Sequence, residues 1–327
     1  MNYQHIVGNE AVHRLLKTIL MQGKTSHACL FTGPEGVGKA TTAQVFAKAL
    51  LCASPEDGMP CDHCNSCRKF DSDNHPDFHR IDGEKGTIKI EQIRELQKNI
   101  YLKAYESENR VYLIDRADNL TIEAANSLLK ILEEPPARSY FILTSHRPFA
   151  LLPTIISRCQ QFNFQPVLSE QLEGYLVDVA AVNQVEAKLL SLLSGGCPGK
   201  AYSIANTPGL LESRVELVQM LTTLLEGNDW DQVKMAEYLE KAKDRLDVFI
   251  EFITLWYRDL LVWKECQNPN LLVNIDMLKK IEDLSQRYSK PGLLGLLNEV
   301  SQTKKALAAN ANARLVLDNL VFRLATQ

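Results

Sequence analysis

The 327-residue sequence has no excess of basic residues: 36 lysines and arginines stand against 40 aspartates and glutamates, for a net charge of −4. A protein that grips duplex DNA alone normally carries a basic surface, so we expect any role on DNA to be shared with partners. No apolar run is long enough to cross a bilayer, and the start lacks the layout of a secretion signal. These absences predict a cytoplasmic protein without a membrane partner.

A disulfide framework is not expected either, because the eight cysteines belong to a chain of cytoplasmic character. Four of them share one short polar loop with the spacing C-x₈-C-x₂-C-x₂-C: Cys52, Cys61, Cys64 and Cys67. Four thiolates complete the tetrahedral shell of Zn²⁺ and leave no open position. We therefore predict a structural zinc site, with an iron–sulfur cluster as the less favoured alternative. His63 and His75 are nearby spare ligands that we expect to be solvated.

Strand-like and helix-like segments alternate from residue 26 to residue 164. Continuous apolar runs at 27–33, 110–115 and 140–145 predict buried strands, and residues 121–134 have helical spacing. This alternation predicts a parallel sheet with flanking helices. After Pro166 nearly everything is helical. We predict an α/β domain over 1–165, a small helical lid over 166–207 and an all-α domain over 208–327.

The stretch GPEGVGKAT, residues 33–41, nearly completes the phosphate-binding pattern G-x-x-x-x-G-K-[ST]. Its glycines let backbone N–H groups wrap a phosphate, and its lysine neutralises phosphate oxygens. The predicted nucleotide-binding residues in this loop are Gly33, Gly36, Gly38 and Lys39. The next residue, Ala40, lacks the hydroxyl that holds Mg²⁺, so magnesium is not expected to bind. ATP binding is in doubt for the same reason, although the backbone cradle that would hold it weakly is kept.

The strand VYLID ends on a candidate acid for the magnesium side of the same site, Asp115. In ATPases of this general class the following residue is a glutamate that orients the attacking water. Here that residue is Arg116, which cannot do so. Two defects on opposite sides of one phosphate predict that this chain does not hydrolyse ATP.

Several of these stretches, taken in order, resemble the bacterial clamp-loader branch of the AAA+ proteins. They are the near-complete phosphate loop, the four-cysteine insert, NSLLKILEEPP at 126–136 and ISRC at 156–159. The resemblance is strong to about residue 205, and the helical remainder matches mainly in character. It implies an AAA+ P-loop domain, a helical lid and a C-terminal helical collar that joins five subunits in a ring.

The resemblance also implies partners and a role. Motor subunits of such a ring bind ATP at their interfaces, open a sliding clamp, place it on primed DNA and release it on hydrolysis. The defects at Ala40 and Arg116 fit a rigid stator subunit, and Gly199 stands about where motor subunits carry a nucleotide-sensing arginine. By the same resemblance Arg158 is an arginine finger that enters the ATP site of the neighbouring subunit.

Two other functions are weighed against the stator. A motor-type subunit that hydrolyses ATP needs a hydroxyl after Lys39 and an acid beside Asp115. This chain has neither. A stand-alone nucleic-acid-binding zinc protein needs a basic and aromatic stripe in the cysteine loop, which this loop lacks. We therefore favour the stator, a non-catalytic subunit that serves a DNA-directed DNA polymerase.

Overall fold

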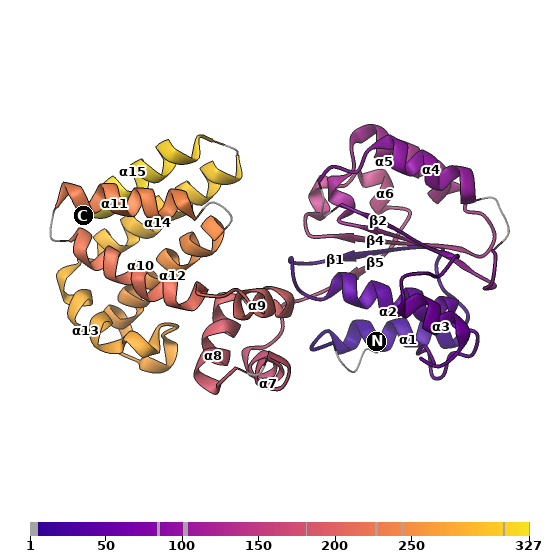
Figure 1. Ribbon diagram of the computed structural model, residues 1–327, viewed down its shortest axis with the longest axis horizontal. Helices are drawn as coiled ribbons and strands as arrows, with labels where there is room; N and C mark the ends of the chain where they lie inside the picture. The colour runs from indigo at the N-terminus through magenta and orange to yellow at the C-terminus, as the bar shows by residue number, and fades with distance from the viewer. Residues whose placement is uncertain are drawn as a thin grey trace. The chain divides into compact units, whose positions relative to one another are not determined.

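The computed structural model describes residues 6–83, 86–100, 104–180, 182–225, 228–242, 245–309 and 311–326. It divides into two compact units, Met1–Tyr175 with Ser194–Ala201, and Leu176–Leu193 with Tyr202–Gln327. An α/β part followed by helical parts was predicted, and this order is confirmed (Figure 1). The domain boundaries at residues 165 and 207 stay predictions.

The α/β part contains five strands joined through helices. Its elements are α1 (Glu10–Met21), β1 (Ala28–Thr32), α2 (Lys39–Leu51), α3 (Asn65–Asp71), β2 (Phe78–Asp82), α4 (Ile90–Ile100), β3 (Arg110–Asp115), the 3₁₀ turn η2 (Ala117–Asn119), α5 (Ile122–Glu133), β4 (Ser139–Ser145), the 3₁₀ turn η3 (Pro148–Ala150), α6 (Pro153–Ile156) and β5 (Gln160–Asn163).

The rest of the chain is described as helices and two further 3₁₀ turns. These are α7 (Ser169–Ala180), α8 (Gln184–Leu193), α9 (Pro198–Ala205), α10 (Leu210–Leu224), α11 (Asp229–Lys241), α12 (Leu246–Cys266), η5 (Pro269–Leu271), η6 (Ile275–Met277), α13 (Leu278–Arg287), α14 (Lys290–Ala308) and α15 (Ala313–Ala325).

The sheet has the order β2-β3-β4-β1-β5, and every neighbouring pair of strands is parallel. The three strands predicted from apolar runs are its central strands, and they are buried almost throughout. The outer strands β2 and β5 were not predicted, because their partly exposed positions carry polar residues. Since all strands run the same way, their carboxyl ends meet at one edge, where parallel sheets usually bind ligands.

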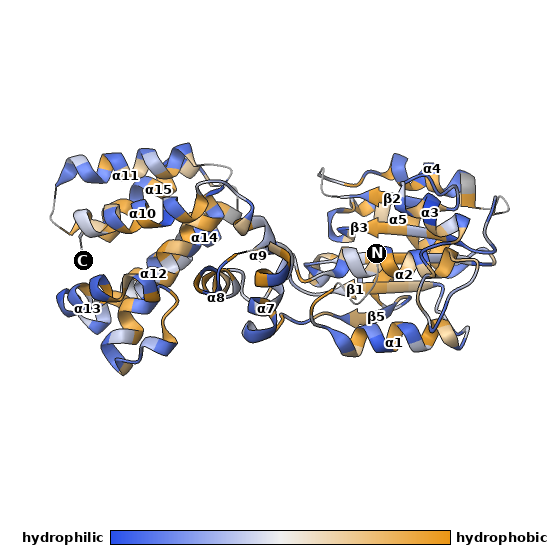
Figure 2. Ribbon diagram, turned by 60° about the horizontal axis from the view of Figure 1, so that its bottom comes forward, coloured by the Kyte–Doolittle hydropathy of each residue, from blue (hydrophilic) through white to orange (hydrophobic). Residues whose placement is uncertain are grey.

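Helices cover both faces of the sheet. Figure 1 shows α1, α2 and α3 on one face and α4, α5 and α6 on the other. Each face has its own apolar core, one centred on Phe31 and Phe46 and the other on Tyr112 and Leu128. Figure 2 shows hydrophobic colour along the strands and on the helix faces turned toward them. The two cores hold the sheet edge and its loops in fixed positions.

The helical unit has a separate core. Its longest helix, α12, buries Trp256 and Tyr257. The last helix, α15, buries four residues along one stripe: Leu317, Leu320, Val321 and Leu324. Among the residues described, no helix combines the length and apolar character needed to cross a membrane.

Two adjacent leucines on α1 test the core beside the phosphate loop. Leu16 is fully buried, whereas Leu15 is 48% exposed. We expect Leu16→Ala to lower the free energy of unfolding of the α/β unit by about 2–5 kcal/mol through lost burial and an added cavity. The matched change Leu15→Ala should cost no more than about 0.5 kcal/mol. Hydrogen exchange of the sheet amides measures both, and equal effects would contradict the packing of α1.

Candidate functional site

The phosphate loop lies at the carboxyl edge of the sheet, between β1 and α2. Gly33 and Gly36 have φ of 144° and 76°, a region that side chains rarely adopt. A Cβ atom on Gly33 would lie 2.4 Å from the carbonyl oxygen of Phe164, and one on Gly36 would lie 2.7 Å from the backbone nitrogen of Lys200. Gly38 is the residue just before α2, with φ of 101°. The predicted loop is therefore formed, and two of its glycines are required by close packing.

Segment 194–201 packs directly against this loop. The backbone N–H of Gly199 donates to the carbonyl oxygen of Gly36 at 2.7 Å. A Cβ atom on Gly199 would lie only 3.1 Å from that same oxygen. Gly195 and Gly196, in the same segment, have φ of 60° and 77°. Gly199, about where the resemblance places an arginine in motor subunits, here touches the loop backbone.

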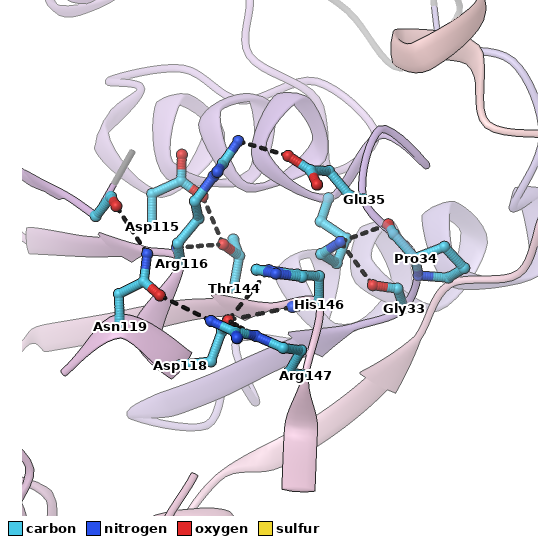
Figure 3. Close-up of polar contacts among 12 residues, drawn as sticks. Gly33, Pro34, Glu35, Asp115, Arg116, Asp118, Asn119, Thr144, His146 and Arg147 are labelled. Atoms are coloured by element: carbon cyan, nitrogen blue, oxygen red, sulfur yellow. Dashed lines mark hydrogen bonds and ion pairs between the residues drawn. The ribbon is translucent and has the colours of Figure 1, made fainter. Parts of the chain in front are cut away.

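Lys39 is directed at the loop itself. Its Nζ atom donates to the carbonyl oxygens of Gly33 and Pro34, both at 2.7 Å, and the residue is only 8% exposed (Figure 3). Burial lowers the pKa of this ammonium group, while the carboxylate of Asp118 is the largest influence raising it. The lysine that would neutralise a phosphate is thus satisfied by carbonyl oxygens of its own loop.

Asp115 ends β3, and both of its carboxylate oxygens are engaged. Oδ1 accepts a hydrogen bond from the hydroxyl of Thr144 at 2.5 Å, and Oδ2 accepts one from Nη2 of Arg80 at 2.9 Å. Arg80 lies on β2, the strand next to β3, and also contacts Asp82 at 3.3 Å. Since a guanidinium is always charged, Asp115 is neutralised by the chain itself.

Arg116, in the place of the catalytic glutamate, is tied to the phosphate loop. Its Nη2 atom contacts Oε1 of Glu35 at 2.7 Å, and its backbone N–H donates to the Thr144 hydroxyl at 3.0 Å (Figure 3). The residue has φ of 53°, which few non-glycine residues adopt. An ion pair therefore joins the phosphate loop to the residue that follows β3.

A second carboxylate, Asp118, organises the end of β4. It accepts from the backbone N–H of His146 at 3.2 Å and from Nε of Arg147 at 3.1 Å, and its side chain is fully buried. Arg147 also donates to the side-chain oxygen of Asn119 at 3.0 Å (Figure 3). Ser145, which precedes this pair of basic residues, is buried and accepts from the backbone N–H of Arg147 at 3.1 Å.

Arg158 lies away from this cluster. It follows α6 and precedes β5, so it lies at the amino-terminal edge of the parallel sheet, opposite the phosphate loop. Its Nη2 atom contacts Oε1 of Glu133 at 2.7 Å, and Nη1 donates to the carbonyl oxygen of Thr154 at 3.0 Å. The side chain keeps 35% of its surface exposed. The predicted finger is therefore a surface residue that does not contact its own phosphate loop.

The four predicted cysteines converge beyond the end of α2. The sulfur atoms of Cys52, Cys61, Cys64 and Cys67 all lie within 4.8 Å of one another. Backbone N–H groups of Cys61, Cys64 and Cys67 each point at the sulfur of the preceding cysteine in the set, at 3.4 Å. Burial opposes ionisation of Cys64, but hydrogen bonds led by that from Cys67 lower its pKa to about 6. This cluster can hold a metal ion such as zinc.

A buried lysine and a buried histidine anchor the cysteine loop. Lys48 on α2 has a side chain only 1% exposed and contacts Asp62 at 2.5 Å and Asp71 at 2.7 Å. His75 was expected to be solvated, and this was wrong: it is buried, and its Nε2 lies 2.9 Å from the hydroxyl of Ser66. His75 is therefore enclosed by residues from other parts of the chain, including Ser66 and Ser107. His63 is exposed, as expected.

The structure brings all five predicted phosphate-site residues to one edge and all four cysteines into one cluster. Sequence reasoning missed three residues around the phosphate site: Arg80 and Thr144, which donate to Asp115, and Asp118, which accepts from Arg147. Their signal was weak, because Arg80 lies in the unrecognised edge strand β2. Fold and site together define a parallel α/β protein with a P-loop-like glycine-rich loop at the carboxyl edge of its sheet, followed by helical parts.

Comparison with known proteins supplies the particular family. Residues 8–168 match the family described as DNA polymerase III, delta subunit, and residues 208–326 match the C-terminal family of the same description. The chain is 31% identical to DNA polymerase III subunit delta' of Bacillus subtilis (strain 168), over 96% of this chain and 95% of that protein. It is 28% identical to subunit delta' of Escherichia coli (strain K12), over 92% and 90%.

Two further likenesses are more distant. Subunit tau of Bacillus subtilis (strain 168) is 26% identical over 98% of this chain and 61% of that protein. A solved structure of a gamma subunit-related protein from Thermotoga maritima is 17% identical, with a TM-score of 0.41, over 95% of this chain and 98% of that one. Because it matches the Bacillus protein over nearly the full length of both chains, the chain belongs to the delta' family of DNA polymerase III subunits.

The cysteine cluster generates the first prediction about the site. We expect the purified chain to carry about one zinc ion and Cys64→Ser to lose it together with thermal stability, because metal binding to thiolates is coupled to folding of the loop. Metal analysis and thermal unfolding measure the two effects. Cys266→Ser, an exposed thiol outside the cluster, is the matched control. Iron in place of zinc, or zinc retained by Cys64→Ser, would contradict the assignment.

Proposed function

We propose that this chain is the stator subunit of a DNA polymerase III clamp loader. It helps to load a sliding clamp onto primed DNA, does not hydrolyse ATP itself, and donates Arg158 to the ATP site of a neighbouring subunit. Its relatives named as delta' subunits support the clamp-loader role. Its partners are the motor subunits and the delta subunit of a five-membered ring, the clamp, and DNA through the complex, all in the cytoplasm.

The engagement of Asp115 is the observation that carries the proposal against hydrolysis. Its carboxylate already contacts Arg80 and Thr144, so a magnesium ion would have to displace a buried hydrogen bond and a bound cation. Lys39 would have to leave two carbonyl oxygens to reach a phosphate. Each group has found its partner within the chain, which disfavours both magnesium binding and turnover.

The position of Arg158 supports action on another subunit. The residue lies at the amino end of β5, and the phosphate loop lies at the carboxyl end of the neighbouring β1. A strand of this length separates the two by roughly 15 Å. An arginine at this place cannot serve its own phosphate loop, whereas its exposed part can enter a partner's site. Residues 208–326, which match the C-terminal family, would supply the collar that joins the ring.

Steady-state ATP hydrolysis by the purified chain, with magnesium and primed DNA, tests the proposal that the chain does not hydrolyse ATP. We expect no turnover above that of the Lys39→Ala variant, because the groups that would bind the metal and orient water are paired internally. Phosphate release is the measurement. Turnover that Lys39→Ala abolishes would reassign the chain as a motor-type subunit.

A reconstituted loader tests the proposal that Arg158 acts at the ATP site of a neighbouring subunit. We expect Arg158→Ala to lower hydrolysis at the neighbouring site by a factor on the order of 10³–10⁵, the contribution of an arginine finger in related chemistry. Arg158→Lys should not restore it, because a lysine lacks the planar fork that matches a phosphoryl group. Arg138→Ala, which removes another exposed arginine on the same unit, is the matched control. Unchanged hydrolysis in Arg158→Ala would refute the finger.

A further inference from the structure

The guanidinium of Arg158 is held in place by three groups of its own chain. Nη2 contacts Oε1 of Glu133 at 2.7 Å, and Nη1 donates to the carbonyl oxygen of Thr154 at 3.0 Å and to the hydroxyl of Ser157 at 3.4 Å. Both terminal nitrogens are therefore engaged. These contacts use three of the five N–H donors of the guanidinium, so a phosphoryl group that binds both terminal nitrogens must compete with them.

Glu133 occupies an unusual place for a carboxylate. It is the last residue of α5, and the helix cannot continue because Pro135 and Pro136 follow. The carboxyl end of a helix is the negative end of its dipole, so a negative charge there is unfavourable unless a cation lies beside it. Arg158, from the segment between α6 and β5, supplies such a cation in addition to Lys130 in the last turn of the helix.

Stability alone does not account for the pair. The side chains of Arg158 and Glu133 are 35% and 50% exposed. Ion pairs this open to solvent contribute little to the free energy of unfolding. The arginine of such a pair can nevertheless exchange its carboxylate readily for a stronger partner. A phosphoryl group that accepts two hydrogen bonds is a stronger partner for guanidinium than one carboxylate oxygen.

We propose that Glu133 is a latch that holds Arg158 in a resting position on its own chain until a neighbouring ATP site offers a phosphoryl group. This inference rests on the proposed function of Arg158 and adds a second residue that controls it. Glu133 does not touch nucleotide and acts as a positioning residue through the arginine. The latch keeps Arg158 withdrawn in most molecules while the ring is not assembled for loading.

The size of the effect follows from the strength of such a pair. With an exposed ion pair, the arginine is not bound to the glutamate in a minority of molecules. Removing the charge of the glutamate leaves the arginine unbound in most molecules. Hydrolysis at the neighbouring site in the absence of DNA should therefore rise about two- to fivefold. A finger acts mainly on the transition state, so kcat should rise while KM for ATP stays the same.

The experiment compares Glu133→Gln with the matched variant Glu134→Gln, the adjacent exposed glutamate. Each is assembled into a loader in which only the ATP site served by Arg158 is active. We expect Glu133→Gln to raise kcat without DNA, Glu133→Asp to restore part of the latch, and Glu134→Gln to match the original chain. In the Arg158→Ala background, Glu133→Gln should have no further effect. Thermal unfolding confirms that each variant is folded.

The failures of the two proposals are distinguishable. If Arg158→Ala lowers hydrolysis but Glu133→Gln leaves it unchanged, the finger stands and the latch is refuted. If Glu133→Gln lowers hydrolysis, Glu133 supports the active position of the arginine, and the latch is again refuted. If Arg158→Ala has no effect on hydrolysis, the finger itself fails and the latch fails with it.

Discussion

The contact between Asp115 and Arg80 is the constraint on which the phosphate site depends. A buried carboxylate needs a compensating charge or several hydrogen bonds, since leaving it unpaired costs several kcal/mol. In a nucleotide-hydrolysing site that charge arrives with magnesium. Here it comes from a neighbouring strand of the same sheet, and Thr144 satisfies the second oxygen. Lys39 likewise bonds to carbonyl oxygens of its own loop, and Arg116 pairs with the exposed Glu35.

The cysteine loop obeys a different constraint. It is too short and too polar to bury a core, so crosslinks and charge pairs must hold it. Four sulfur atoms within 4.8 Å can be joined by a metal ion, and Lys48 pairs with two aspartates of the loop. Because Lys48 lies on α2, the helix that begins at the phosphate loop, the same helix supports both features.

The withdrawal of Arg158 complements this internal pairing. The carboxylates of Asp115 and Asp118 are buried, whereas the Arg116–Glu35 and Arg158–Glu133 pairs are both partly open to solvent. Partially exposed pairs exchange partners at little cost, and buried ones do not. The buried carboxylates of the phosphate site therefore keep their partners, whereas the exposed ion pairs can exchange theirs.

The sequence by itself determined the central strands, the phosphate loop and the four-cysteine cluster, because continuous apolar runs and fixed spacings are local signals. It did not reveal β2 or β5, since edge strands mix polar and apolar residues. Only the tertiary structure decided that Arg80 meets Asp115, that Lys39 bonds its own loop, that His75 is buried and that Glu133 holds Arg158. Most of these contacts join residues far apart in the chain, and even the short-range bonds of Lys39 depend on the folded loop. Partner choice for a charged side chain is a property of three-dimensional proximity, which no local pattern encodes.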